Sequence, residues 1–157
     1  IYVRSRHEKN VHSVLLDKGI DASLPMRTVV REWSDRKKKV KLPLFRGYVF
    51  VNIDLKINNL NVLQTPGAVK FIGIRKEPSR IPNEQIHWMH MLAAEPTTVR
   101  AEKEIPLGQR VRVKAGPFKG TEGMVKRVGS RSRLVVLIES IMQGVSIDIK
   151  PECLENI

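Results

Sequence analysis

The sequence has a single cysteine, no long apolar run and a shortage of acidic residues. Cys153 is the only cysteine among 157 residues, which excludes a disulfide within one chain and fits a reducing compartment. No apolar run approaches the ~20 residues of a membrane-spanning helix, and no amphipathic basic helix stands out. We find no secretory signal, and the chain opens at Ile1 rather than at a methionine. These absences favour a cytoplasmic protein without a membrane partner.

The shortage of acid leaves the chain strongly basic. Lys and Arg number 28 against 16 Asp and Glu, a net charge of +12. A charge of this sign favours polyanionic partners such as DNA, RNA or an anionic surface. The excess is uneven, because residues 1–100 hold 18 basic and 9 acidic residues whereas residues 101–157 hold 10 and 7. The front of the chain is therefore the better candidate for contact with nucleic acid.

The residue patterns of enzymes and metal sites are also missing. Cys153 has no motif around it, which favours a structural thiol over a nucleophile. His87 and His90 have a spacing that could hold a metal, but no third ligand follows at metal spacing. No phosphate-cradling glycine loop precedes a helix, and no Ser-His-Asp elbow occurs. We expect no catalytic site, no metal and no cofactor.

The spacing of apolar residues predicts helices and strands in the front part of the chain. Val11, Val14 and Leu15 stand at helical spacing, and Gly19 is typical of a helix end. Asn83 suits the N-cap of a later helix. The expected helices are 8–18, 57–64 and 84–94, and the expected strands are 1–6, 26–33, 43–51 and 68–74.

The rear part of the chain has a different composition and a different spacing of apolar residues. The polar stretch EPTTVRAEKE, residues 95–104, lacks an apolar period and predicts a linker. From residue 105 onward, short β-rich runs punctuated by glycine recur about every ten residues, which predicts a small barrel. We therefore expect an α+β domain at 1–94, with an antiparallel sheet and flanking helices, and a small β-barrel domain at 105–157.

Residues 43–51, PLFRGYVFV, predict a strand that is apolar on both faces. Tyr48 and Phe50 would point one way, and Val49 and Val51 the other. The β-branched pair suits a buried face. The aromatic pair has two explanations: it lies under the last predicted helix as ordinary core, or it forms an aromatic binding site.

The run RKKKVK precedes that strand. If residues 36–41 are extended, Lys37, Lys39 and Lys41 share one face and repeat every ~6.6 Å. That arrangement suits a phosphate backbone and would make binding salt-dependent. The alternative is a solvated hairpin tip that keeps the protein soluble, and both explanations stay open.

Several stretches carry a resemblance to a known family. GQRVRVKAGPFKGTEGMVKRV resembles a KOW motif, with Gly116-Pro117 as a tight turn and Phe118 as a plug for the barrel end. WSDRKKKVKLPLFRGYVFVNID and GAVKFIGIRKEPSRIPNEQI resemble the N-terminal domain of the NusG family of transcription elongation factors. Within the family they resemble the specialised paralogues of the RfaH and UpxY kind, which act on selected operons for surface polysaccharides. The resemblance covers nearly all of the chain and implies an SH3-like barrel at the rear.

The resemblance implies a polymerase-binding surface on the front domain. Phe45, Tyr48 and Phe50 would form a hydrophobic pocket for the clamp helices of the largest RNA polymerase subunit. Arg46 stands where the family commonly has proline, and Ile1 stands where an aromatic residue is usual.

A second polymerase contact follows from the same resemblance. Asn58 and Asn59 fall where the specialised paralogues touch the polymerase gate loop with a short polar motif. The alternative is an N-cap for the following helix.

The resemblance also implies a nucleic-acid surface. It places the exposed non-template DNA strand near Arg6 and His7 and near Asn61 and Gln64. The predicted nucleic-acid-binding residues are Arg4, Arg6, His7, Lys9, Arg36, Lys37, Lys39, Lys41, Asn61 and Gln64.

The rear domain would bind a second partner. NusG itself has a loop here that binds a ribosomal protein or the termination factor Rho, and this chain has Ile141-Met142-Gln143-Gly144 in its place. Met142 preserves an apolar contact, whereas the family's arginine is absent, which favours the ribosomal protein over Rho. We predict Phe118, Met142 and Gln143 as partner-binding residues. Some specialised members refold this domain into helices, but the β-branched runs favour a barrel.

These patterns predict a monomeric, non-enzymatic transcription elongation and antitermination factor that suppresses pausing or termination on selected operons. The alternative function is a KOW-type RNA- or ribosome-binding protein that does not act on polymerase.

Overall fold

The computed structural model describes residues 1–33, 36–74, 77–94, 100–102, 108–116, 118–128, 131–138, 141 and 143–157. The chain divides into two compact units, Ile1–Ala94 and Glu95–Ile157, which we call the front and rear units. Arg100–Glu102, inside the segment expected to be a linker, instead form strand β9 of the rear unit. Met142 lies outside the described residues.

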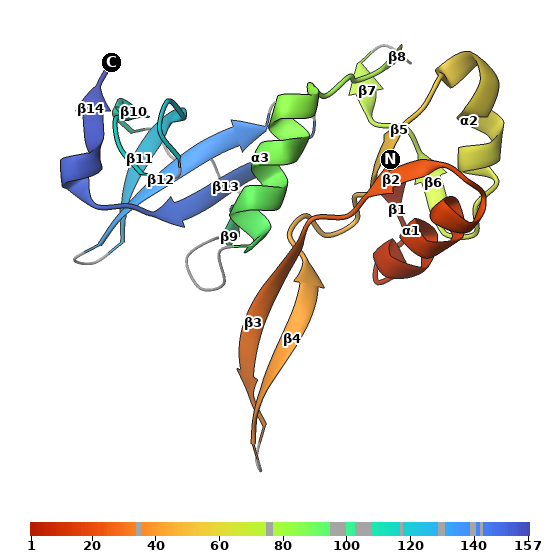
Figure 1. The fold of residues 1–157 in the computed structure, drawn as a ribbon, viewed down its shortest axis with the longest axis horizontal. Coiled ribbons are helices and arrows are strands. Elements are labelled where there is room, and N and C mark those ends of the chain that lie inside the picture. Colours follow the sequence, from red (N-terminus) through yellow and green to blue (C-terminus); the bar gives the residue numbers. More distant parts are fainter. Residues whose placement is uncertain are drawn as a thin grey trace. The chain divides into compact units, whose positions relative to one another are not determined.

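The front unit combines helices with short antiparallel strand pairs (Figure 1). The pairs are β1 with β6, β2 with β5, β3 with β4 and β7 with β8, and α1 packs against β2, α2 against β6 and α3 against β3. This arrangement confirms the predicted α+β class. In chain order the elements are β1 (Tyr2–Val3), α1 (Glu8–Asp17), β2 (Asp21–Ser23), β3 (Met26–Glu32), β4 (Lys37–Pro43), β5 (Phe50–Asn52), α2 (Leu55–Leu63), β6 (Ala68–Lys70), β7 (Gly73–Ile74), β8 (Glu77–Pro78) and α3 (Asn83–Ala94).

Helix α1 forms because its apolar residues recur every four positions and fill the core. Val11 and Leu15 are both 0% exposed, and Gly19 ends the helix with a left-handed φ of +72°. The core around them is Val3, Val11, Leu15, Ile20, Leu24, Val49 and Val62. Burial of Val49 agrees with the inward-facing role that its β-branched side chain predicted.

Helix α2 begins earlier than the sequence predicted. The side chain of Asp54 caps it, because Asp54 Oδ1 accepts a hydrogen bond of 2.9 Å from the Lys56 N–H. Asn58 and Asn59 therefore lie inside the helix and are not its N-cap.

The prediction of one continuous strand over residues 43–51 is wrong. Strand β4 ends at Pro43, a turn follows, and β5 begins only at Phe50. The turn arises because Gly47 has φ +82° and its N–H donates to the buried Glu8 Oε1 at 2.8 Å, away from any strand ladder. Tyr48 then makes an isolated antiparallel bridge with Tyr2.

Strands β3 and β4 form a regular hairpin whose far end lies away from α1 and α2 (Figure 1). Seven residue pairs run from Met26 opposite Pro43 to Glu32 opposite Lys37. Beyond them the Trp33 N–H donates to the Arg36 carbonyl at 2.8 Å.

The rear unit is a six-stranded antiparallel arrangement in the order β14-β10-β11-β12-β13-β9. It is strand-rich in the manner of a KOW or SH3-like fold, which confirms the predicted class. Gly123 is required where β11 passes β12, because a Cβ there would stand 2.5 Å from the Val135 carbonyl oxygen. The strands are β9 (Arg100–Glu102), β10 (Arg110–Val113), β11 (Glu122–Val128), β12 (Arg131–Ile138), β13 (Gln143–Asp148) and β14 (Leu154–Asn156).

An ion pair between a buried arginine and a partly buried aspartate joins β12 to β13 in the rear unit. Arg133 stands opposite Asp148 in the register, and its Nε lies 3.3 Å from Asp148 Oδ1. The Arg133 side chain is 6% exposed and that of Asp148 is 26% exposed, so solvent screens this pair much less than it screens a surface pair.

Asp148→Ala is expected to destabilise the rear unit by about 1–3 kcal/mol, because it removes a carboxylate that faces the buried Arg133 guanidinium. Hydrogen exchange at the amides of β12 and β13 measures the loss. The front unit holds both tryptophans, so their fluorescence would not report it. The control is Glu122→Ala, which removes the partner of Arg112 at a pair that is 46% and 40% exposed and so should cost less. Equal loss of amide protection in the two variants would contradict the inference that the less exposed Arg133–Asp148 pair contributes more to stability than the Arg112–Glu122 pair.

Candidate functional site

Four aromatic residues of the front unit form two edge-to-face pairs. The Phe45 and Phe50 rings lie 6.0 Å apart at 83°, and the Tyr2 and Tyr48 rings lie 5.9 Å apart at 75°. Phe45 and Phe50 are 1% and 7% exposed and therefore belong to the core, whereas Tyr48 is half-buried and Tyr2 is 39% exposed. Of these four rings, the accessible ones are those of Tyr2 and Tyr48, which we call the tyrosine pair.

Tyr2 was missing from the residues predicted to bind a partner. Its proximity to Tyr48 could not be inferred from a local pattern, because the isolated bridge that brings the two rings together joins distant parts of the chain. Gly47 makes the meeting possible: a Cβ at this position would stand 3.0 Å from Tyr2 Cε2.

The start of α1 carries part of the predicted nucleic-acid set. Arg4, Arg6, His7 and Lys9 are all exposed. Arg6 has a positive φ of 65°, a conformation that is uncommon outside glycine and is often associated with binding sites. The Lys9 ammonium donates to the Lys41 carbonyl at 3.0 Å and so connects α1 to the base of the hairpin.

The end of α2 lies beside the same segment. The Arg4 N–H donates to the Gly67 carbonyl at 2.9 Å, and a Cβ at Gly67 would stand 3.1 Å from His7 Cβ. Asn61 and Gln64, both exposed, belong to this helix end. The structure therefore brings the loop after Gln64 next to His7.

The predicted gate-loop residues lie earlier on α2. Asn59 is exposed and Asn58 is half-buried. Their role as contact residues stays a prediction.

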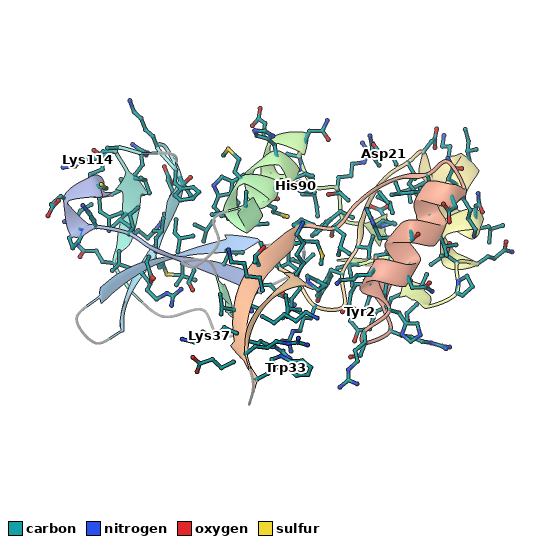
Figure 2. The ribbon with its side chains drawn as sticks, turned by 60° about the horizontal axis from the view of Figure 1, so that its bottom comes forward. Tyr2, Asp21, Trp33, Lys37, His90 and Lys114 are labelled. Carbon is teal, nitrogen blue, oxygen red and sulfur yellow. The ribbon has the colours of Figure 1, made fainter. Side chains whose placement is uncertain are left out.

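The β3–β4 hairpin, with its end residues Trp33 and Arg36, forms what we call the basic hairpin. Its register places Lys37, Lys39 and Lys41 on one face, as the alternation of an extended strand predicted. All three are exposed, and Lys37 Nζ lies 2.8 Å from Glu32 Oε1 in a pair that is 72% exposed on both sides. Figure 2 shows Lys37 and Trp33 at the far end of the hairpin, on opposite sides of the ribbon.

In the rear unit, the turn between β10 and β11 carries Phe118. This residue is half-buried, and the flanking Gly116 and Gly120 have φ +89° and +86°. Gln143, at the start of β13, is also half-buried.

The arginines of β10 are occupied by ion pairs. Arg112 Nη2 lies 2.6 Å from Glu122 Oε1, and its Nη1 lies 3.7 Å from Glu155. The hydrogen bond and the charge of Glu122 raise the pKa of Arg112. Arg110 lies 3.6 Å from Glu122 as well.

The histidines and the cysteine that could serve metal or thiol chemistry have the following surroundings among the described residues. Within the part of the chain that the structure describes, no group of three or more His, Cys, Asp and Glu is arranged to hold a metal. His90 Nε2 lies 2.6 Å from Ser23 Oγ, and Cys153 is half-buried in a short 3₁₀ turn. No helix among the described residues is long and apolar enough to cross a membrane.

Comparison with known proteins places these features in a family context. The family model described as "Transcription termination factor nusG" matches residues 1–90, and the KOW motif model matches residues 107–128. The "Transcription termination/antitermination protein NusG" of Borreliella burgdorferi is 24% identical, with 98% of this chain and 94% of the relative covered. The protein of the same name from Staphylococcus carnosus is 24% identical over 99% of this chain and 88% of its own length. A solved structure described as "Crystal Structure of MjSpt4:Spt5 complex conformation B" aligns with a TM-score of 0.33 at 20% identity, covering 99% of this chain and 93% of that chain.

Gly47→Ala is expected to displace the Tyr2 ring and to destabilise the front unit by more than Gly19→Ala does. Both substitutions force a side chain into the left-handed region, at a cost of about 1 kcal/mol. Only Gly47 adds a contact at 3.0 Å, because nothing lies within 4 Å of a Cβ at Gly19. Denaturation followed by tryptophan fluorescence and the NMR signals of the Tyr2 ring measure the two effects. Equal destabilisation by the two substitutions, with an unmoved Tyr2 ring, would contradict the conclusion that Gly47 makes room for Tyr2.

Proposed function

Because this chain belongs to the NusG family of transcription termination and antitermination factors, we propose that it binds RNA polymerase through the tyrosine pair. The observation that carries the proposal is the partly exposed Tyr2–Tyr48 pair in the unit that the family model matches. Membership in the family confirms the resemblance inferred from the sequence. The specialised subgroup of the RfaH and UpxY kind stays a prediction.

The proposed partner of the tyrosine pair is the clamp-helix tip of the largest polymerase subunit. Tyr2 and Tyr48 offer apolar rings with a polar hydroxyl, a combination common at interface hot spots. Phe45 and Phe50 are 1% and 7% exposed, so we assign them to the core and not to the contact surface. Asn59 on α2 would reach the gate loop as a secondary contact.

A ligand shifts an equilibrium toward the state that it binds better. A factor that holds the clamp in its closed state would therefore disfavour paused or terminating states. The proposed effect is antitermination, and operon selection would come from the exposed residues Arg4, Arg6 and His7 meeting the non-template strand.

The basic hairpin supplies the sequence-independent part of nucleic-acid binding. Lys37, Lys39 and Lys41 share an exposed face, where each phosphate contact releases a counterion. The rear unit is less suited to this role, because Arg110 and Arg112 are already paired with glutamates. We assign the rear unit to a second protein partner, a ribosomal protein, through Phe118 and Gln143; the predicted contact at Met142 falls outside the described residues.

Tyr2→Ala and Tyr48→Ala should each weaken binding to an isolated clamp-helix fragment by about tenfold or more, the loss typical of a hot-spot residue. Titration of the labelled fragment with the full chain measures the loss. The matched control is Leu16→Ala, which removes another exposed apolar side chain, 49% exposed, from α1. Phe45→Ala is not suitable, because emptying a buried site costs about 3–5 kcal/mol of stability. Unchanged affinity in both folded tyrosine variants would refute this docking surface.

The triple variant Lys37→Gln, Lys39→Gln, Lys41→Gln should bind single-stranded DNA with a weaker salt dependence. Three lost phosphate contacts reduce the slope of log K against log salt by about 2. The matched control replaces three exposed rear-unit lysines, Lys114, Lys119 and Lys150, and so changes the net charge equally. If both triple variants show the same slope, total charge rather than the hairpin governs binding. Tight RNA binding that depends on the rear-unit lysines would favour the alternative function, a KOW-type RNA-binding protein.

A further inference from the structure

Trp33 at the end of the basic hairpin has no evident role in the fold. Its side chain is 60% exposed, which is unusual for the largest apolar residue. Its backbone is nevertheless fixed, because its N–H donates to the Arg36 carbonyl at 2.8 Å and its carbonyl accepts from the Arg36 N–H at 3.3 Å. An indole is therefore presented to solvent from a closed hairpin end (Figure 2).

The hairpin register shows what surrounds the indole. Alternation along β3 and β4 places Trp33 on the same face as Arg31 and its cross-strand partner Lys38. Glu32 belongs to the opposite face, where Lys37 neutralises it at 2.8 Å. Among the described residues, the face that carries Trp33 holds cations and no acidic side chain.

We propose that Trp33 is a stacking platform for an unpaired nucleobase, with Arg31 and Lys38 contacting the adjoining phosphates. Aromatic side chains beside a cationic track are the usual elements of single-strand binding, because every base offers a π face. In a duplex interior the base faces are already stacked, so the indole selects an unpaired strand. The inference deepens the proposed function and rests on the hairpin meeting nucleic acid.

An anionic membrane surface would also attract tryptophan and lysine, but the hairpin is poorly built for lipid. Insertion requires apolar side chains gathered on one face. The other strongly exposed apolar residue of the hairpin, Val30 at 56%, lies on the face opposite Trp33. The lysines lie on both faces of the hairpin. A flexible nucleic-acid strand can contact both faces, whereas a flat membrane surface can contact only one.

The test compares Trp33→Ala with the wild-type full chain by fluorescence anisotropy. The probes are oligo(dT) and oligo(U) of about 15 nucleotides, which suits the usual span of single-strand sites. An abasic oligomer of equal length, a blunt DNA duplex and phosphatidylserine vesicles complete the set. We expect Trp33→Ala to weaken binding to oligo(dT), oligo(U) or both by about tenfold and to leave binding to the abasic oligomer unchanged. The probe that loses affinity identifies DNA or RNA as the source of the base.

Two variants keep the result interpretable. Trp33→Phe retains a ring and should restore most of the affinity, whereas Val30→Ala removes an exposed apolar group from the opposite face and should have no effect. Circular dichroism checks that each variant is folded.

Equal binding of wild type and Trp33→Ala to both oligomers would overturn the inference, as would an equal loss on the abasic oligomer or the duplex. A loss confined to the vesicles would overturn it in favour of a membrane surface. The triple lysine variant separates this failure from that of the proposed function. If it weakens oligomer binding while Trp33→Ala does not, the hairpin contact stands without stacking. If neither variant changes binding, the proposed hairpin contact fails as well.

Discussion

The front unit depends on one buried hydrogen bond, between the Glu8 carboxylate and the Gly47 N–H. It spans 39 residues and joins the first turn of α1 to the turn between β4 and β5. A carboxylate that is 6% exposed is costly unless it is compensated, so the turn that presents the Gly47 N–H is held against α1. The same turn sends Val49 into the core and sets Tyr48 against Tyr2. The position of the aromatic surface therefore follows from an electrostatic requirement of the core.

The two units use their positive charge differently. On the basic hairpin, the lysines are exposed along an extended ribbon, and the ion pair of Lys37 with Glu32 is 72% exposed on both sides. On β10 of the rear unit, Arg110 and Arg112 share Glu122, and Arg112 also approaches Glu155. A cation already held by carboxylates has less to gain from a phosphate. The unequal distribution of net charge along the sequence is thus reinforced by the local pairing.

Sequence patterns were sufficient where the structure depends on neighbours in the chain. The helical period of Val11 and Leu15, the inward side chain of Val49 and the shared face of Lys37 and Lys39 are all local consequences of backbone geometry. The strand over residues 43–51 failed because its interruption depends on Glu8, and the tyrosine pair was missed because Tyr2 lies far from Tyr48 in sequence. Strand β9 was missed because a short polar segment can be ordered by its pairing with β13 alone. Side-chain periodicity carries no information on such distant partners.

The basic hairpin also fixes a distance. Its seven residue pairs extend the end about 20 Å from the base, at the usual rise of a strand. The base is anchored, because Lys9 on α1 bonds the Lys41 carbonyl, and the same helix supplies Glu8 to the turn that carries Tyr48. A ligand at the end of the hairpin and a protein on the tyrosines would thus be held apart by the length of the paired strands. The length of the ribbon would act as a molecular ruler, so that adding or removing a residue pair changes which nucleotide lies within reach.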